Sequence, residues 1–526
     1  MGSTVDGRRV TTAIREDSPS PSARAFLRRH WPLWLALALV LVGRIALYDW
    51  AFSPDESGFY LVADDLLHHG GDGLYGHYWV DRPPLLIWLF MIAAGFGDIA
   101  AVRWLVAVFY LLFLVLTYVT SRRLGGSGGW AVAIAAAFAI TPEVGAQVAN
   151  GEAFSIPFVM ASILCAAIAA GHTGRRALVW STAAGFLGLL AMTAKQNFVD
   201  GLVFAFVLLV ANGLRGERTW PDVVRRLVAG AAGIVAACAI MVAYALTTGA
   251  GVAGLWLASV SFRGDASRVI RAGYRTGIES REDAIIASAW VSGIIPLLLV
   301  LLVVALLARF RGSSISWAVA VVIGVEILCI VVGGNYWSHY LLGLAPGLAL
   351  AAGLALRQDP ARRRAVRSGR TWAHWLVLPA AAYLICSALV SMPLAVAEQD
   401  SSASTRSERI GGFVADSAEP GDTATTLFGR ADAQFQTGLR SPYQHLWSLP
   451  VRVLDPDLKE LTALLESEQA PTWIVQVFSF HEWGLDPEGR IDPVVARRYD
   501  IVYDACGTRI YKLKSAERDL APAPAC

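Results

Sequence analysis

Charge is scarce in this 526-residue chain, where Asp, Glu, Lys and Arg together make up 16% of the residues. A soluble domain carries about 25% charge, so this chain cannot cover a water-facing surface of its size. With 55% hydrophobic residues and a mean hydropathy of +0.50, it is also too apolar to be disordered. The net charge of +2 gives no reason to expect bulk nucleic-acid binding. The composition therefore predicts a polytopic membrane protein.

Lysine and cysteine are scarce as well. Lysine occurs only at positions 195, 459, 512 and 514, which together with abundant Ala, Gly and Val is typical of a GC-rich bacterial genome. The six cysteines show no zinc-type spacing, and four of them lie inside apolar runs. Cys506 and Cys526 lie in the polar C-terminal part. If that part is outside the cell, the two cysteines can form a disulfide. The alternative is that both remain unpaired thiols.

Long apolar runs dominate the chain between residues 31 and 394. The first extends from Trp31 to about Trp50, and no small-residue cleavage site follows it, so a retained anchor fits better than a signal peptide. Further runs lie near 100–120, 129–141, 154–170, 178–194, 198–213, 225–247, 285–308, 316–332, 340–356 and 372–394. At roughly 20 residues per span, these runs predict about eleven membrane helices.

The arginines alternate along the loops in a way that predicts topology. Residues 1–30 are polar and arginine-containing, which predicts a disordered cytoplasmic tail. Every second connection is then arginine-rich and cytoplasmic, whereas loops 141–153 and 333–339 hold no Lys or Arg. One expected outer loop, 249–284, breaks the rule with five arginines.

An odd number of spans places residues 395–526 outside the cytoplasm. Short runs rich in β-branched and aromatic residues predict strands at Thr425–Phe428, Trp473–Phe478 and Ile501–Tyr503. The stretch Pro456–Glu468 predicts an amphipathic helix. We therefore expect a multi-pass α-helical membrane protein with a small C-terminal extracytoplasmic α/β domain.

The first outer loop, residues 51–98, carries the chemically informative residues. Ser53, Pro54 and Glu56 form a capping-box start for a helix that lies at the membrane surface, and Gly70-Gly71 stops it. Capping does not require Asp55, so its carboxylate is a candidate for chemistry. Glu56 is a second candidate, although it would serve equally well as a cap residue.

Further along this loop, Pro83-Pro84 starts a short apolar helix at 85–97, which topology requires to be shallow or re-entrant. Arg82 would then lie at membrane depth beside a helix N-terminus, a suitable place for an anion. The alternative is an arginine that only reaches toward the lipid headgroups.

Several motifs together resemble the GT-C integral-membrane glycosyltransferases, in the branch of protein O-mannosyltransferases and lipid A aminoarabinose transferases. They are Asp55-Glu56 after the first span, Gly73-Leu74-Tyr75, Asp81-Arg82-Pro83-Pro84-Leu85, the apolar span ending in Lys195, and His339-Tyr340-Leu341 through Pro346. The resemblance covers residues 31–526. The chain departs from it at Gly73-Leu74-Tyr75, which lacks a spacer residue, and in the second outer loop, where the usual acidic residue is Glu143 or Glu152.

The resemblance implies transfer of a sugar from a polyprenyl-phosphate donor to a hydroxyl of a glycan, lipid or protein at the outer face of the cell membrane. It implies single displacement with inversion. Asp55, with Glu56, would be catalytic, and Arg82 and Lys195 would bind the donor phosphate. Glu152, His339 and Tyr340 would contact substrate, or else only cap and anchor their helices.

The resemblance leaves the metal, the sugar and the acceptor open. Asp55, His77, Asp81 and His339 could gather near one point, but their spacing is too weak for a metal site, so we expect no obligatory metal. A transporter or flippase of lipid-linked sugars is the main alternative, although no internal repeat is visible. A ligase or polymerase that uses diphosphate-linked donors is another, whereas an assembly protein would leave the first loop unexplained.

Overall fold

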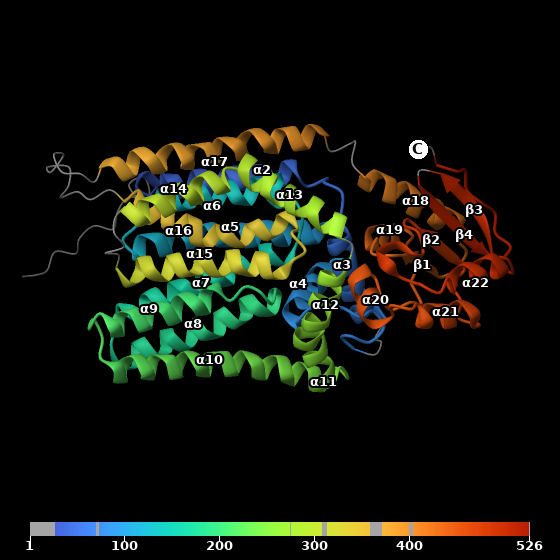
Figure 1. Cartoon of the computed structure of the whole chain (residues 1–526), viewed down its shortest axis with the longest axis horizontal. Helices are drawn as coiled ribbons and strands as arrows, with labels where there is room; N and C mark the ends of the chain where they lie inside the picture. The colour runs from blue at the N-terminus through green and yellow to red at the C-terminus, as the bar shows by residue number, and fades with distance from the viewer. Residues whose placement is uncertain are drawn as a thin grey trace, which may run out of the picture.

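The structure is a computed structural model, and it describes residues 27–69, 73–273, 275–307, 313–357, 371–398, 403–505 and 507–524. Most of the predicted cytoplasmic tail lies outside these residues, as do Cys506 and Cys526. The described chain forms a bundle of long helices at one end and a smaller α/β domain at the other (Figure 1).

A helix lies at every position where the sequence predicts a span. These helices are α2 (Trp31–Ala46), α5 (Ala100–Arg123), α6 (Gly128–Ile140), α7 (Gly151–Ala170), α8 (Gly174–Ala194), α9 (Asp200–Leu214), α10 (Trp220–Thr247), α13 (Arg275–Val291), α14 (Ile294–Leu307), α15 (Ser314–Gly333), α16 (Leu344–Ala355) and α17 (Thr371–Glu398). The last of them continues past the predicted boundary at residue 394.

The expected number of spans is not confirmed. Among the described residues, seven helices are long and apolar enough to cross a membrane, or eight if α13 and α14, bent by 70°, act as one. Helices α2, α6 and α9 have 16, 13 and 15 residues. At 1.5 Å per residue, each is shorter than the roughly 30 Å hydrocarbon core. Most of α6 is buried by protein, so it need not match the bilayer thickness.

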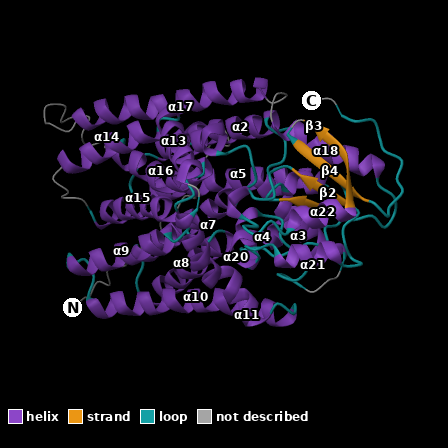
Figure 2. Cartoon of the chain, turned by 45° about the vertical axis from the view of Figure 1, so that its right-hand side comes forward, coloured by secondary structure: helices purple, strands orange, loops and turns teal. Residues whose placement is uncertain are grey.

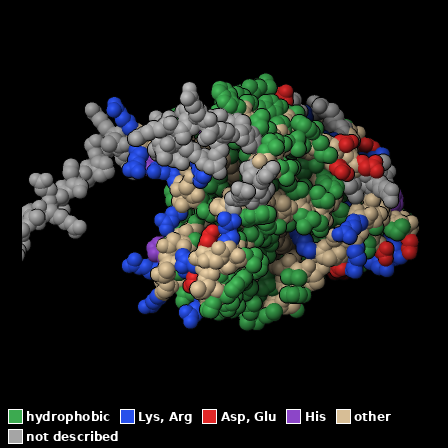
Figure 3. Space-filling view, turned by 60° about the vertical axis from the view of Figure 1, so that its left-hand side comes forward, with side chains coloured by type: hydrophobic (Ala, Val, Ile, Leu, Met, Phe, Trp, Pro, Cys, Tyr) green, Lys and Arg blue, Asp and Glu red, His purple; other side chains and the backbone are tan. Residues whose placement is uncertain are grey.

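The outside of the bundle is apolar where lipid would meet it. Large hydrophobic side chains are exposed along α10, α14 and α17, among them Val228, Leu306 and Val390. Figure 3 shows this hydrophobic band across the middle of the molecule, with Lys and Arg side chains gathered beyond it at the end opposite the α/β domain. The chain is therefore a multi-pass membrane protein.

Short helices lie between the bundle and the α/β domain. They are α3 (Pro54–His68), α4 (Pro84–Ala94), α11 (Gly251–Trp256) and α12 (Phe262–Ala272), the last two joined by a π-helical turn at Leu257–Ser261. The predicted capping box at the start of α3 is confirmed: the Ser53 hydroxyl accepts from the Glu56 N–H, and the Glu56 carboxylate accepts from the Ser53 N–H. The predicted helix at 85–97 is α4.

The C-terminal α/β domain, named the outer domain after its predicted location, is a four-stranded sheet with helices around it (Figure 2). Strands β1 (Ala424–Leu427) and β2 (Trp473–Gln476) pair in parallel, and the antiparallel strands β4 (Thr508–Leu513) and β3 (Tyr499–Ala505) complete the order β1-β2-β4-β3. The helices are α18 (Ala403–Ser417), α19 (Ala431–Gln436), α20 (Ser448–Leu454), α21 (Lys459–Glu466) and α22 (Ile491–Arg498). The three predicted strands and the predicted helix, α21, are confirmed, whereas β4 was not expected.

The outer domain packs directly on the first outer loop. The Arg440 guanidinium lies 2.9 Å from the Asp65 carboxylate of α3, and the Tyr78 hydroxyl accepts from the Ser441 N–H at 2.9 Å. The Phe435 ring packs edge-on against Tyr60. Because α3 lies between α4 and α19, its apolar residues are buried by protein rather than by lipid.

Candidate active site

Asp55 lies in the first turn of α3, and the outer domain holds it in place. The indole Nε1–H of Trp447 donates to Asp55 Oδ1 at 3.0 Å. The Trp447 ring fits because Gly58 has no side chain: a Cβ there would lie 2.3 Å from a ring carbon. The ring also packs on Phe59, with centroids 5.3 Å apart. The carboxylate is half-buried and faces the boundary between the two domains.

Glu56, one residue further on, is in a different environment. Its carboxylate is fully buried and lies 2.9 Å from the Arg103 guanidinium of α5. It also accepts from the Ala149 N–H at 2.6 Å and from the Ser53 N–H at 2.9 Å. These bonds tie α3 to α5 and to the second outer loop, so they use the Glu56 carboxylate for structure.

Asp81 joins its neighbour Arg82 to two side chains from distant parts of the chain, those of Arg263 and Gln196. The Arg82 guanidinium lies 2.5 Å from one carboxylate oxygen and that of Arg263, on α12, lies 2.8 Å from the other. The Gln196 amide donates to the Asp81 carbonyl at 2.8 Å. Burial raises the pKa of the Asp81 carboxyl, but the positive charges of Arg263 and Arg82 outweigh it and hold the pKa below its usual value.

A second group surrounds Lys195, which directly follows the last residue of α8. Its ammonium forms an ion pair with the buried Glu152 carboxylate of α7 and lies 4.6 Å from the centre of the Tyr340 ring. His339 Nε2 is 3.7 Å from the same Glu152 oxygen. Gly151 leaves room for the lysine, since a Cβ there would lie 3.1 Å from the Lys195 side chain.

These two groups and Asp55 belong to one site. The carboxylates of Asp55 and Glu152 act electrostatically on the Arg82 guanidinium, and the charges of Arg82 and Asp55 act on Lys195. The structure thus brings together six of the predicted residues, namely Asp55, Arg82, Glu152, Lys195, His339 and Tyr340. Among them, the Arg82 and Lys195 side chains are mostly buried, with 14% and 12% of their surface still exposed.

The site contains further residues that the sequence did not assign individually. Arg263 enters from the 249–284 loop, whose arginines violate the positive-inside rule, and that violation was the available signal. Its buried Nε atom has no hydrogen-bond partner among the described residues. Asp81 was named as part of the motif around Arg82 and as a possible metal ligand, and nothing in the sequence pointed to Trp447.

In the part of the chain that the structure describes, no three His, Cys, Asp or Glu side chains converge as a metal site would require. Asp55, His77, Asp81 and His339 therefore do not form such a group. Whether the reaction needs a metal stays a prediction.

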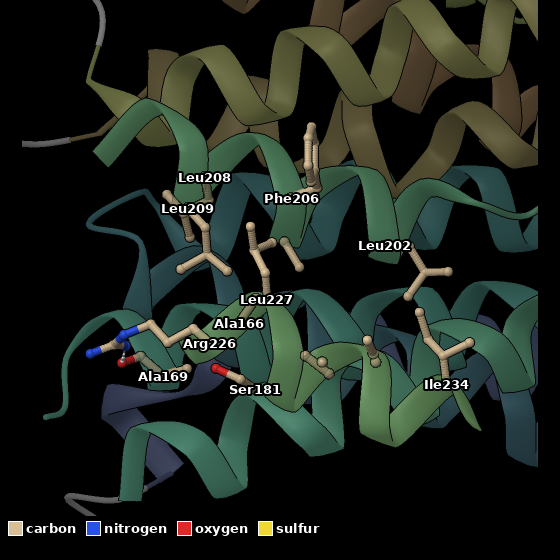
Figure 4. Close-up of a pocket in the computed structure, with 15 residues that line it drawn as sticks. Ala166, Ala169, Ser181, Leu202, Phe206, Leu208, Leu209, Arg226, Leu227 and Ile234 are labelled. Atoms are coloured by element: carbon tan, nitrogen blue, oxygen red, sulfur yellow. Dashed lines mark hydrogen bonds between the residues drawn. The ribbon is translucent and has the colours of Figure 1, made fainter. Parts of the chain in front are cut away.

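The cavity shown in Figure 4 is separate from this charged site. It has a volume of about 300 Å³ and is lined by small and apolar residues of α7, α8, α9 and α10. Its one charged residue, Arg226, donates to the carbonyls of Ala169 and His172 and to the Asp222 carboxylate. This arrangement leaves the cavity without a free charge, so it offers no chemistry.

A bundle of membrane helices, a first outer loop with an Asp-Glu pair at a helix start, and an outer α/β domain together define the GT-C type of fold. Comparison with solved structures agrees. The chain is similar to ArnT from Cupriavidus metallidurans, in two crystal structures.

The structure of ArnT bound to undecaprenyl phosphate has a TM-score of 0.56 with 14% sequence identity, covering 92% of this chain and 99% of that one. The apo structure has a TM-score of 0.58 with 14% identity, covering 92% and 98%. No protein-family model and no curated protein sequence matches the chain. The predicted fold is therefore confirmed at the level of structure.

Proposed function

We propose that this protein is a glycosyltransferase that moves a sugar from a polyprenyl-phosphate donor to a hydroxyl acceptor at the outer face of the membrane. One observation carries the proposal: a carboxylate, Asp55, lies in the same site as the cations Arg82, Lys195 and Arg263. The shared fold with ArnT, whose structure holds undecaprenyl phosphate, supports the choice of donor.

The proposed reaction is a single displacement with inversion. The acceptor hydroxyl attacks the anomeric carbon, and Asp55 takes its proton as general base. The bond between that carbon and the phosphate oxygen breaks, and polyprenyl phosphate leaves with one more negative charge. Fixed cations stabilise this charge better than water does because they need not reorganise.

The cations proposed to stabilise the leaving phosphate come from three segments of the chain. Arg82 bonds Asp81 through Nη1, which among the described residues leaves its other nitrogens for a phosphate oxygen. Arg263 contributes its unpartnered Nε, and Lys195 supplies an ammonium. We assign Glu152, His339 and Tyr340 to holding Lys195 in place, because all three surround it. Glu56 holds α3 rather than taking part in the chemistry.

The test uses purified protein in detergent with a panel of polyprenyl-phosphate sugars and a crude envelope extract as acceptor. The expected result is release of polyprenyl phosphate from at least one donor, dependent on the extract. A transporter or flippase would leave every donor intact, and that result would reject the proposed enzyme. A preference for diphosphate-linked donors would favour a ligase or polymerase.

A further inference from the structure

Two arginines outside the proposed catalytic cluster lie close together where the outer domain meets the bundle. Arg281 is on α13 and Arg452 is on α20, and both are half-buried. Burial lowers the pKa of the Arg452 guanidinium, and the positive charge of Arg281 acts in the same direction. The segments that hold them are in contact, since a Cβ at Gly334 would lie 3.7 Å from the Ile270 side chain.

Each guanidinium is held by a carbonyl and an aromatic face. Arg281 Nε donates to the Asn335 carbonyl at 2.9 Å, and the guanidinium lies 5.0 Å from the Trp337 ring centre. Arg452 Nη2 donates to the Val269 carbonyl at 3.2 Å, and its guanidinium lies 5.6 Å from the Trp483 ring centre. These contacts fix both groups without neutralising either charge.

The guanidiniums of Arg281 and Arg452 both lack an acidic partner within the described part of the chain. Among the described residues, no carboxylate forms an ion pair with Arg281 or Arg452 or contributes to their electrostatics. Arg268, on the exposed side of α12 nearby, pairs with Asp265 instead. Gly273 also makes room for the pair, because a Cβ there would lie 2.5 Å from Arg452 Nη2. Two fixed, uncompensated guanidiniums are costly unless an anion joins them.

The pair borders the catalytic cluster. The Trp337 ring, which carries Arg281, stacks parallel to His339 at 6.4 Å between centroids. Tyr340, whose ring faces the Lys195 ammonium, also lies close enough to Arg281 and Arg263 to act on both electrostatically. The segment 337–340 therefore separates the donor cations from this second pair of cations.

We propose that Arg281 and Arg452 form a second anion site, which takes a phosphate-type group of the acceptor. Planar guanidinium forks match tetrahedral oxyanions, and two of them hold such a group from two sides. The assignment to the acceptor rests on the proposed function, whereas the anion site does not. The acceptor would be an anionic glycan or lipid, held by its phosphate while a hydroxyl reaches Asp55.

The test measures binding, so it needs no turnover. Radiolabelled inorganic pyrophosphate is dialysed to equilibrium against the full chain in nanodiscs of neutral phosphatidylcholine. Wild type should bind two equivalents. The variant Arg281→Gln/Arg452→Gln should lose one of them, and Arg82→Gln should lose the other. The control Arg268→Gln/Arg271→Gln removes the same charge from the exposed side of α12 and should keep both.

The outcomes separate the two proposals. If the Arg281/Arg452 variant still binds two equivalents, or the control loses as much, the second site is rejected. If wild type binds one equivalent, and the Arg281/Arg452 variant loses it while Arg82→Gln keeps it, the second site stands and the donor site is rejected. If the double variant does not fold, Arg452→Gln alone, on the outer domain, should weaken the second equivalent at least tenfold, and unchanged binding would reject the site.

A second arm identifies the source of the phosphate. Nanodiscs that contain phosphatidylglycerol should still bind two equivalents if the site takes the acceptor. Loss of the second equivalent in these discs, and only when both arginines are present, would make the ligand a phospholipid headgroup and overturn the acceptor assignment.

Discussion

Two neighbouring carboxylates at the start of α3, Asp55 and Glu56, have different surroundings, although they are adjacent in the sequence. Asp55 accepts one hydrogen bond, from Trp447, and stays half-buried. Glu56 is fully buried with Arg103. The capping box was readable from the sequence because its partners are three residues apart. The ion pair with Arg103 was not, because its partner is 47 residues away.

Glu56→Gln should destabilise the protein, even though glutamine can complete a capping box. The substitution leaves the Arg103 charge buried without its partner, which costs about 3–5 kcal/mol. Resistance of the purified protein to unfolding by sodium dodecyl sulfate measures the change. Asp64→Asn, on the exposed side of the same helix, is the control and should change stability by less than about 0.5 kcal/mol. Equal behaviour of the two variants would show that the buried pair contributes nothing.

Arg82→Ala, Lys195→Ala and Arg263→Ala should each weaken use of the donor. A charge-assisted contact to phosphate contributes about 1.5–3 kcal/mol, so the donor concentration for half-maximal rate should rise roughly 10- to 100-fold. Arg268→Ala, five residues further along α12 from Arg263 and exposed, is the matched control. Unchanged donor dependence in all three variants would remove these residues from the phosphate site.

Trp447→Phe should slow turnover while leaving donor affinity unchanged. Phenylalanine keeps an aromatic ring against Phe59 but loses the N–H that holds the Asp55 carboxylate. A hydrogen bond to a charged group contributes about 1.5–3 kcal/mol, so kcat should fall about 10-fold or more with KM for the donor unaltered. Trp104→Phe, on the lipid-exposed side of α5, should have no such effect. A change in KM alone would contradict the positioning role.

At the scale of whole elements, the sequence predicted positions better than lengths. Apolar runs located the helices of the bundle because membrane helices need such runs. The first run was predicted to continue to about Trp50, whereas α2 ends at Ala46, since composition does not show where a chain turns. Strand β4 was not predicted because the charged residues Arg509 and Lys512 interrupt its short apolar run. The bend between α13 and α14 depends on Gly293, whose φ of +82° fits a glycine.

The outer domain should lose stability in acid through Asp422. Burial raises the pKa of this carboxyl, but bonds from Arg518, the Glu419 N–H and Trp473 outweigh it and lower the pKa from 3.8 to about 2. Because the folded value lies below the unfolded one, the stabilisation is complete above about pH 4 and disappears as the pH falls toward about 2.

Trp473 fluorescence can follow this acid transition, since its indole N–H donates to Asp422 at 3.0 Å. Asp422→Asn should remove the pH dependence in that range. A transition at the same pH in the variant would show that another group controls it.

The site could not be assembled from the sequence because it forms only in the whole molecule. Asp55 and Trp447 are 392 residues apart, and Asp81 and Arg263 are 182 apart. No local pattern encodes such contacts. The resemblance to a known family nevertheless grouped Asp55, Arg82 and Lys195, which lie near one another in the structure, because it carries information about the fold.

The orientation of the whole molecule can be tested by labelling. The arginine-rich connections at one end of the bundle predict that this end faces the cytoplasm. In a cysteine-free background, a membrane-impermeant maleimide added to intact cells should label Glu488→Cys in the outer domain, but not Arg176→Cys at the start of α8. Both positions are exposed, so the reverse pattern would put the proposed active site on the cytoplasmic side.

The most direct test of the central claim is a single-turnover measurement with Asp55→Asn. Protein in excess is loaded with a polyprenyl-phosphate sugar that wild type consumes, the acceptor is added, and the loss of donor is followed. Asparagine keeps the size of the side chain but is not a base, so the rate should fall about 10²- to 10⁴-fold with donor binding intact. A rate near that of wild type with donor bound would show that Asp55 is not the base, and the proposed mechanism would be wrong at its centre.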